Sequence, residues 1–143
     1  MSFEIIALEH KLHVATTKLL RERDFGQLQG NSGEVLLTHR ELIKELSKEQ
    51  RFKHKMAEDV ESDEEFISRI LTFLRETAFS YPGKTILVGA HGGTIRHLLI
   101  HFGELSYETS DAMTVENAAY IRLESDGVDF FIKELKGIKN PHD

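Results

Sequence analysis

Hydrophobic positions recur at helical spacing in three stretches of the first eighty residues. They predict a short helix over 3–10, with Ser2 as its N-cap, and a second helix over 35–48, started by a capping box of Thr38 and Glu41. A third helix opens at another capping box, Ser62-Asp63-Glu64-Glu65. Its apolar face is well defined: Phe66, Ile70, Phe73, Leu74 and Ala78.

Between these helices the chain is strongly polar. Residues 48–62 carry many charges and few apolar positions, which predicts a mobile connection or a polar helix at the surface. Residues 11–20 lean towards β structure, because Leu12 and Val14 alternate with polar positions.

The run 85–89 is continuously apolar and follows Pro82-Gly83. It predicts a buried strand, followed by a tight turn over 90–93 and an apolar helix from 94 to a stop at Gly103. The order of helix, strand and helix is half of a βαβ alternation. We therefore expect a single α/β domain over 1–143, with a mostly parallel sheet flanked by helices on both faces.

The C-terminal part reads as a hairpin. Residues 104–113 form a polar linker, and two strands follow, 118–124 and 128–135, joined by Ser-Asp-Gly. Asp-Gly tolerates the positive φ that such loops require. The last seven residues, 137–143, are predicted to be frayed.

Composition narrows the possible functions. The net charge of -6 and the pI near 5.7 argue against nucleic acid or an anionic membrane as a general partner, since either needs a basic face. The chain has no cysteine, which excludes disulfides, thiolate metal sites and a cysteine nucleophile. Its first residues lack a basic leader pattern, and no apolar run reaches the ~20 residues that span a bilayer, so we expect a cytoplasmic protein.

His91 is the strongest candidate for chemistry. It ends the predicted strand, and Gly92 and Gly93 follow it into a helix whose first N–H groups lack internal partners. A lone histidine here could be a buried core residue. Two glycines, however, let a ligand approach the backbone, which favours an anion site with phosphate as the first ligand to try.

Glu22 is the second candidate. Its carboxylate lies between Arg21 and Arg23, and the alternatives are a surface charge or a general acid or base. The two arginines are interpreted as solvated. His97 and His101, at i and i+4 on a helix, could form half of a metal site, but no glutamate completes an HExxH pattern; we interpret them as ordinary helix-face residues and predict no metal or cofactor.

Four segments in order resemble the histidine phosphatase superfamily, which includes the phosphoglycerate mutases: LLRERDFGQLQG, ESDEEFISR, ILVGAHGGTIRHLL and TVENAAYIRLE. The resemblance covers about Leu12 to Glu124 and implies a phosphoglycerate mutase-like fold. It implies that Glu22 donates a proton to the leaving group, that His91 is the second histidine on the transferred phosphoryl group, and that Gly92 and Gly93 offer phosphate-binding backbone. The usual glycine before Glu61-Ser62 is replaced by Val60.

Two family segments that would precede Leu12 are absent there, an Arg-His-Gly motif and a later Ser-x-x-x-Arg segment that supplies another phosphate-binding arginine. The family begins with a strand ending in Arg-His-Gly, whose histidine takes the phosphoryl group, and this chain contains no such string. The resemblance therefore implies a fold that is truncated at its N-terminus, and an enzyme acting on a small phosphate ester that is weak or inactive as this chain alone.

Two other interpretations stay open. The chain could be a non-enzymatic phosphate-binding module that forms homo-oligomers through the sheet edges left by the missing strand. It could also be an unrelated α/β domain in which 91–93 is only an anion loop. In each case the expected ligand is phosphate or a small phosphorylated metabolite, with neither nucleic acid nor membrane as partner.

Overall fold

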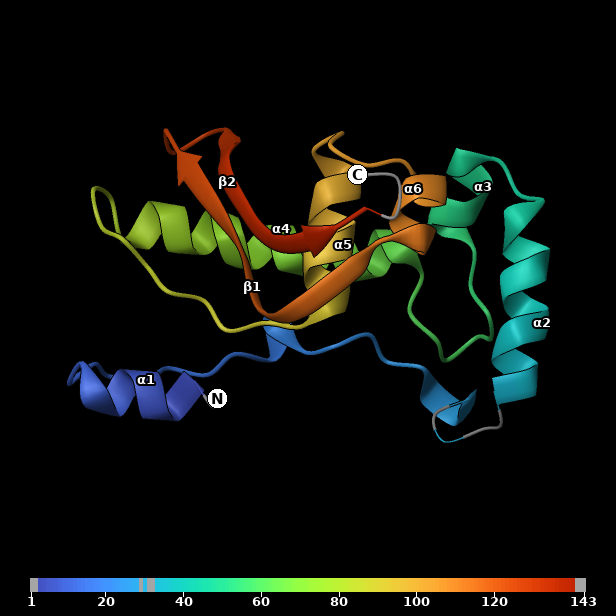
Figure 1. The fold of residues 1–143 in the computed structure, drawn as a ribbon, viewed down its shortest axis with the longest axis horizontal. Helices are drawn as coiled ribbons and strands as arrows, with labels where there is room; N and C mark the ends of the chain where they lie inside the picture. Colours follow the sequence, from blue (N-terminus) through green and yellow to red (C-terminus); the bar gives the residue numbers. More distant parts are fainter. Residues whose placement is uncertain (1–2, 29, 31–32, 141–143) are drawn as a thin grey trace.

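Helices are the main regular structure of the molecule. A computed structural model describes residues 3–28, 30 and 33–140 of the 143-residue chain. Its elements are α1 Phe3–Glu9, η1 Lys18–Leu20, η2 Gly26–Leu28, α2 Gly33–Lys44, α3 Lys48–Lys53, α4 Asp63–Ser80, α5 Gly92–His101, α6 Tyr107–Ala112, β1 Thr114–Ser125 and β2 Phe130–Lys139, where η marks a short 3-10 turn. Figure 1 shows α4 and α5 crossing at the centre, with the hairpin laid over them and α2 and α3 at one side.

The core lies where α4 meets α5. The capping box predicted at the start of α4 is confirmed, because the Ser62 hydroxyl accepts from the Glu65 N–H and the Glu65 carboxylate accepts from the Ser62 N–H. The apolar face of α4 then packs against Leu98, and its buried members are Phe66, Ile67, Ile70 and Leu71. Fully burying one such side chain is worth about 1.5–3 kcal/mol, so this face holds the two helices together.

The boundaries of α2 and α3 differ from the predicted ones. The capping box at Thr38 is wrong, since α2 begins at Gly33 and the Thr38 hydroxyl donates to the Glu34 carbonyl inside the helix. The box that does form joins Ser47 and Gln50 and starts α3. For residues 48–62 the prediction was a mobile connection or a polar helix. The polar helix is right for residues 48–53. The predicted N-cap of α1, Ser2, lies outside the described residues.

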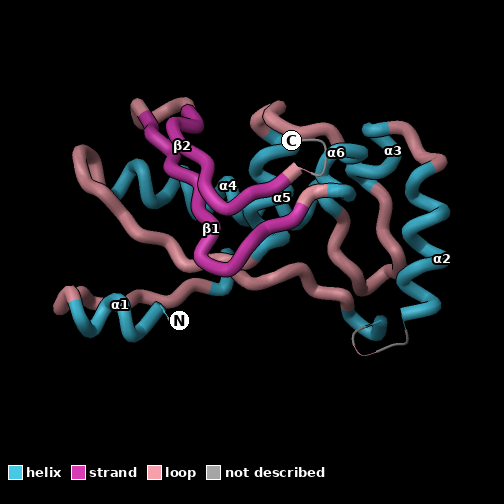
Figure 2. Tube along the Cα trace, viewed as in Figure 1, coloured by secondary structure: helices cyan, strands magenta, loops and turns pink. Residues whose placement is uncertain are grey.

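The strand predicted over 85–89 is wrong. Residues 84–91 belong to no helix or strand, and the side chains of Ile86, Leu87 and Val88 are exposed. Figure 2 shows this stretch as a loop between α4 and α5. A strand needs a neighbouring backbone to bond with, and no described residue supplies one here. The β-leaning stretch 11–17 is likewise without regular structure.

The sheet is a two-stranded antiparallel hairpin. The two predicted strands are confirmed and are longer than expected, with β2 taking in Gly137 of the tail that was predicted to fray. The α/β character is thus confirmed, but all strand pairing among the described residues is antiparallel, not parallel. Residues 106–113, predicted as linker, hold α6, whose N-cap is Ser106. Within the part of the chain that the structure describes, no helix is long and apolar enough to cross a membrane.

Candidate functional site

The first turn of α5 carries the predicted anion site. His91 is the N-cap residue, with an extended backbone at φ -115 and ψ 162, and its side chain makes no capping hydrogen bond. Its imidazole is exposed and is not the buried core histidine of the alternative interpretation. Gly92 and Gly93 are the first two helical residues, so their N–H groups have no acceptor within the helix and lie at the positive end of its dipole.

Glu22 lies against this turn. A Cβ atom added to Gly93 would be 2.5 Å from Oε1 of Glu22, so the carboxylate occupies the space that a side chain at 93 would need. The same oxygen accepts from the Arg23 N–H at 3.0 Å. At Gly92 an added Cβ would meet only Val115 of β1, at an ordinary 3.8 Å. The structure therefore brings Glu22 against Gly93, which is far from it in the sequence and two residues after His91.

The backbone of the Glu22 loop, residues 19–24, is held by α4. Arg69 donates to the carbonyl of Leu19 at 2.8 Å and to that of Glu22 at 3.2 Å, and it forms a two-pronged ion pair with Glu61 at 2.7 and 3.0 Å. Glu61 in turn accepts from the Asp24 N–H at 3.1 Å. We call Arg69 and Glu61 the backbone clamp. The charge of Arg69 and hydrogen bonds keep the pKa of Glu61 below its usual value, although burial acts in the opposite direction.

The side chain of Arg23 is held by a second group, the Asp63 triad of Arg23, Asp63 and His97. Arg23 pairs with Asp63, the first residue of α4, and its Nη2 lies 2.9 Å from Nε2 of His97. Nδ1 of His97 lies 2.8 Å from the carbonyl oxygen of Gly93, which can only accept, so this nitrogen carries a proton. The triad thus joins the loop, α4 and the first turn of α5.

Charges around Asp63 are strongly coupled. Burial alone would raise the pKa of Asp63, but its hydrogen bonds with His97 and Arg23 and the positive charge of Arg23 hold it well below its ordinary range. Burial and the charge of Asp63 raise the pKa of Tyr107 in α6, which hydrogen-bonds to it. Arg51 of α3 stacks 4.2 Å from the Tyr107 ring. The triad is therefore the centre of a polar network that joins four helices, α3, α4, α5 and α6, and the loop 19–24.

The Phe66 ring contacts both arginines, Arg23 and Arg69. The guanidinium of Arg69 lies 4.6 Å from the centre of the Phe66 ring and that of Arg23 lies 5.4 Å from it. Such cation–π contacts are worth about 0.5–1 kcal/mol or more when shielded from water. The prediction that Arg23 is solvated is therefore wrong, whereas Arg21 is exposed as expected.

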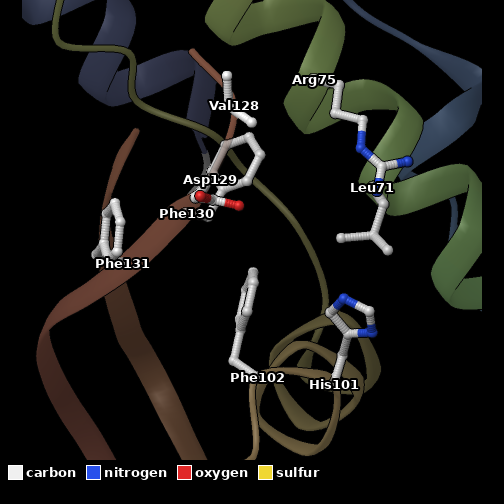
Figure 3. A pocket seen from close by; sticks show the side chains of 8 residues that line it. All are labelled: Leu71, Arg75, His101, Phe102, Val128, Asp129, Phe130 and Phe131. Atoms are coloured by element: carbon white, nitrogen blue, oxygen red, sulfur yellow. The ribbon is translucent and has the colours of Figure 1, made fainter. Parts of the chain in front are cut away.

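Two hollows of the surface lie away from these residues. A cavity of about 350 Å³ lies between α4, the C-terminal end of α5 and the hairpin turn (Figure 3), where Arg75 and His101 face Phe130 across it. His101 ends a ten-residue helix that starts beside His91, so this cavity is about 15 Å from the first residue of that helix. A second cavity of about 420 Å³ lies beside α2 at His39. Among residues 3–28, 30 and 33–140 no three His, Asp or Glu side chains are grouped to hold a metal ion.

Sequence reasoning missed Asp63, Arg69 and the buried role of His97. A usable signal was present: Asp63 and Arg69 each stand three residues from Phe66, so they border the apolar face of a strongly patterned helix. Charges in such a place are retained only when partners exist. For His97 the spacing of four from Gly93 puts the imidazole over the carbonyl of that turn.

Comparisons with known proteins agree with one family. No curated protein and no solved structure matches the chain. A family model does match it over residues 1–137, and that model describes the histidine phosphatase superfamily (branch 1).

Proposed function

Because the chain belongs to the histidine phosphatase superfamily, we propose that it binds the phosphoryl group of a small phosphate ester between Glu22 and the first turn of α5. The supporting observation is the position of the Glu22 carboxylate beside Gly93, next to the exposed imidazole of His91. This arrangement provides a proton donor and a set of anion-binding N–H groups around one point in space.

In the proposed reaction the phosphorus–oxygen bond to the leaving group breaks, and a new phosphorus–oxygen bond forms to the acceptor, which is water in hydrolysis or a second alcohol in transfer and which releases its proton. The N–H groups of Gly92 and Gly93, and His91, offset charge on the phosphoryl oxygens. Glu22 in its acid form gives its proton to the departing alkoxide, which leaves as an alcohol. Fixed donors of this kind are worth about 2.7–4 kcal/mol each in transition-state stabilisation.

The lack of a nucleophilic phosphoryl acceptor limits the rate of turnover. No Arg-His-Gly string occurs in the sequence, and His91 has the second-histidine context rather than that of the nucleophile. We therefore propose that this chain alone binds phosphate esters but turns them over weakly or not at all.

The test measures binding and turnover separately. Inorganic phosphate is titrated by calorimetry, and p-nitrophenyl phosphate hydrolysis is followed by absorbance, for the unaltered chain, His91→Ala and Glu22→Gln. His101→Ala, at the other end of the same helix, is the matched control. We expect His91→Ala to weaken phosphate binding about tenfold or more, since a charge-assisted hydrogen bond is worth about 1.5–3 kcal/mol.

Two results would contradict the proposal in different ways. Phosphate binding that is absent, or equal in His91→Ala and the unaltered chain, removes the site. If the unaltered chain hydrolyses p-nitrophenyl phosphate rapidly and His91→Ala does not, His91 is the nucleophile and the proposal of weak activity is wrong.

A second candidate function is a non-enzymatic module that assembles with further copies of itself. It is favoured by the exposed apolar stretch Ile86–Val88, which has no charged residue within it. In this proposal 85–89 becomes a strand when a second chain supplies its neighbours, and the mostly parallel sheet forms only then. Sedimentation that shows a monomer up to high concentration would exclude it.

A further inference from the structure

The Asp63 triad contacts both sides of the proposed site without being part of it. Arg23 directly follows Glu22 in the chain. His97 contacts Arg23 through Nε2 and the carbonyl of Gly93 through Nδ1, and Gly93 is the residue against which the Glu22 carboxylate lies. One imidazole therefore connects the side chain of Arg23, next to Glu22, with the carbonyl of Gly93, the residue against which the Glu22 carboxylate lies.

We propose that His97 and Asp63 are positioning residues that hold Glu22 at the first turn of α5, an inference that rests on the proposed function. His97 fixes the distance between the loop and the helix, because it is bonded at both ring nitrogens. Asp63 fixes the position of Arg23 and of the ring, since its Oδ1 pairs with Arg23 and lies 3.3 Å from Nε2 of His97.

The chemistry of the triad favours a geometric role over simple packing. A buried ion pair is often no more stabilising than apolar side chains of the same volume, because both charges lose water. The Phe66 ring, 5.1 Å from the His97 ring, shows that apolar packing is present directly beside the triad. The hydrogen bonds of two charged groups and an imidazole depend on direction, so they fix the relative orientation of the loop and the helix, which apolar contacts do not.

The backbone clamp performs a different task. Arg69 holds the loop on α4 through the carbonyls of Leu19 and Glu22, and its ion pair is with Glu61, so these bonds of Arg69 join the loop to α4 and to Glu61 rather than to α5. Without the triad, the loop would remain attached to α4, and the Glu22 carboxylate would lose its fixed distance to Gly93.

The experiment is a double-mutant cycle read at the Gly93 amide by ¹H–¹⁵N NMR. Glu22→Gln removes the carboxylate charge next to Gly93 and is expected to shift the Gly93 resonance. The same change is then made in a His97→Gln background, where we expect the shift to fall by more than half. His97→Asn, whose amide nitrogen can still donate to the Gly93 carbonyl, is expected to restore part of it. His101→Gln, one turn further along, is the matched control and should leave the shift unchanged.

A shift of equal size with and without His97 would overturn the proposal, and so would equal behaviour of His97→Asn and His97→Gln. Should His97→Gln fail to fold, which its spectrum shows directly, Asp63→Asn takes its place in the cycle with the same expectation. The readout needs neither turnover nor bound phosphate. A chain that binds no phosphate but shows the coupling would refute the proposed function and keep the positioning role.

Discussion

Two loops of this protein are opposites in composition and in how they are held. Residues 19–24 are rich in charge, yet they are fixed by Arg69 and Asp63 of α4, by His97 of α5 and by Glu61. Residues 84–91 have the large apolar run Ile86–Val88 at their centre, yet they lie exposed and take part in no strand. Hydropathy alone predicts the reverse, a solvated loop and a buried strand.

The difference lies in where each loop finds its partners. A charged loop can be ordered by a few side chains from one neighbouring helix, because each guanidinium offers five donors in a fixed direction. An apolar strand needs backbone on its edges and cover on both faces, which come from distant segments. Four experiments test this difference between the two loops.

Asp63→Ala is expected to have the largest effect. It leaves the guanidinium of Arg23 buried without its carboxylate, which costs about 3–5 kcal/mol of unfolding free energy. Urea unfolding followed by circular dichroism measures the change. Glu64→Ala, the exposed neighbour in the same helical turn, should change stability by no more than about 0.5 kcal/mol. Equal effects of the two variants would mean that the triad adds nothing to stability.

Arg69→Ala should come next, at about 1.5–3 kcal/mol, because two loop carbonyls and Glu61 lose their donor. Arg69→Lys keeps the charge but not the fork, so we expect an intermediate loss. Hydrogen exchange should quicken at the Asp24 amide, whose acceptor is Glu61. Arg75→Ala on the same helix is the control, and an equal loss there would contradict a specific clamp.

The triad also predicts how stability depends on pH. The folded-state pKa of Asp63 lies below its ordinary value of 3.8, so its stabilising contribution is present above that pH and is lost as the pH falls through the lower folded-state pKa. Asp63→Asn should flatten the acid side of the stability curve, measured by urea unfolding between about pH 5 and 2. Parallel curves for the two proteins would show that other carboxylates carry the acid response.

Leu87→Lys should have the smallest effect on stability, within about 0.5 kcal/mol, since its side chain is already exposed. If the apolar loop mediates association, the same change lowers the sedimentation coefficient of concentrated samples to that of a monomer. Phe79→Lys, an exposed apolar position on α4, is the matched control. A stability loss of several kcal/mol from Leu87→Lys would mean that this loop is packed.

Several features that depend on near neighbours could be predicted from the sequence. The capping box at Ser62, the apolar face of α4 and the hairpin at Asp126-Gly127 all follow from residues within a few positions of one another. The site residues Glu22, His91, Gly92 and Gly93 were located from the histidine-glycine turn at a helix start and from the charged run around Glu22, the family pattern supplied their roles, and these roles stay predictions.

What was missed depends on contacts between distant segments. Arg23 and His97 are 74 positions apart, and nothing local distinguishes Arg23 from the exposed Arg21. The strand prediction at 85–89 was wrong for the same reason. An apolar run favours burial, but other segments of the chain must cover it. Helix α6 was overlooked since its six residues are polar and its cap, Ser106, looked like a linker residue.

The backbone clamp has one more consequence, for how this loop tolerates sequence change. Arg69 contacts the main-chain carbonyls of Leu19 and Glu22, and every amino acid has that carbonyl. Mutations at position 22 can therefore replace the functional group without releasing the anchor that presents it. The geometry of this loop thus depends on main-chain contacts, and the chemistry at position 22 can be changed by engineering on the same scaffold.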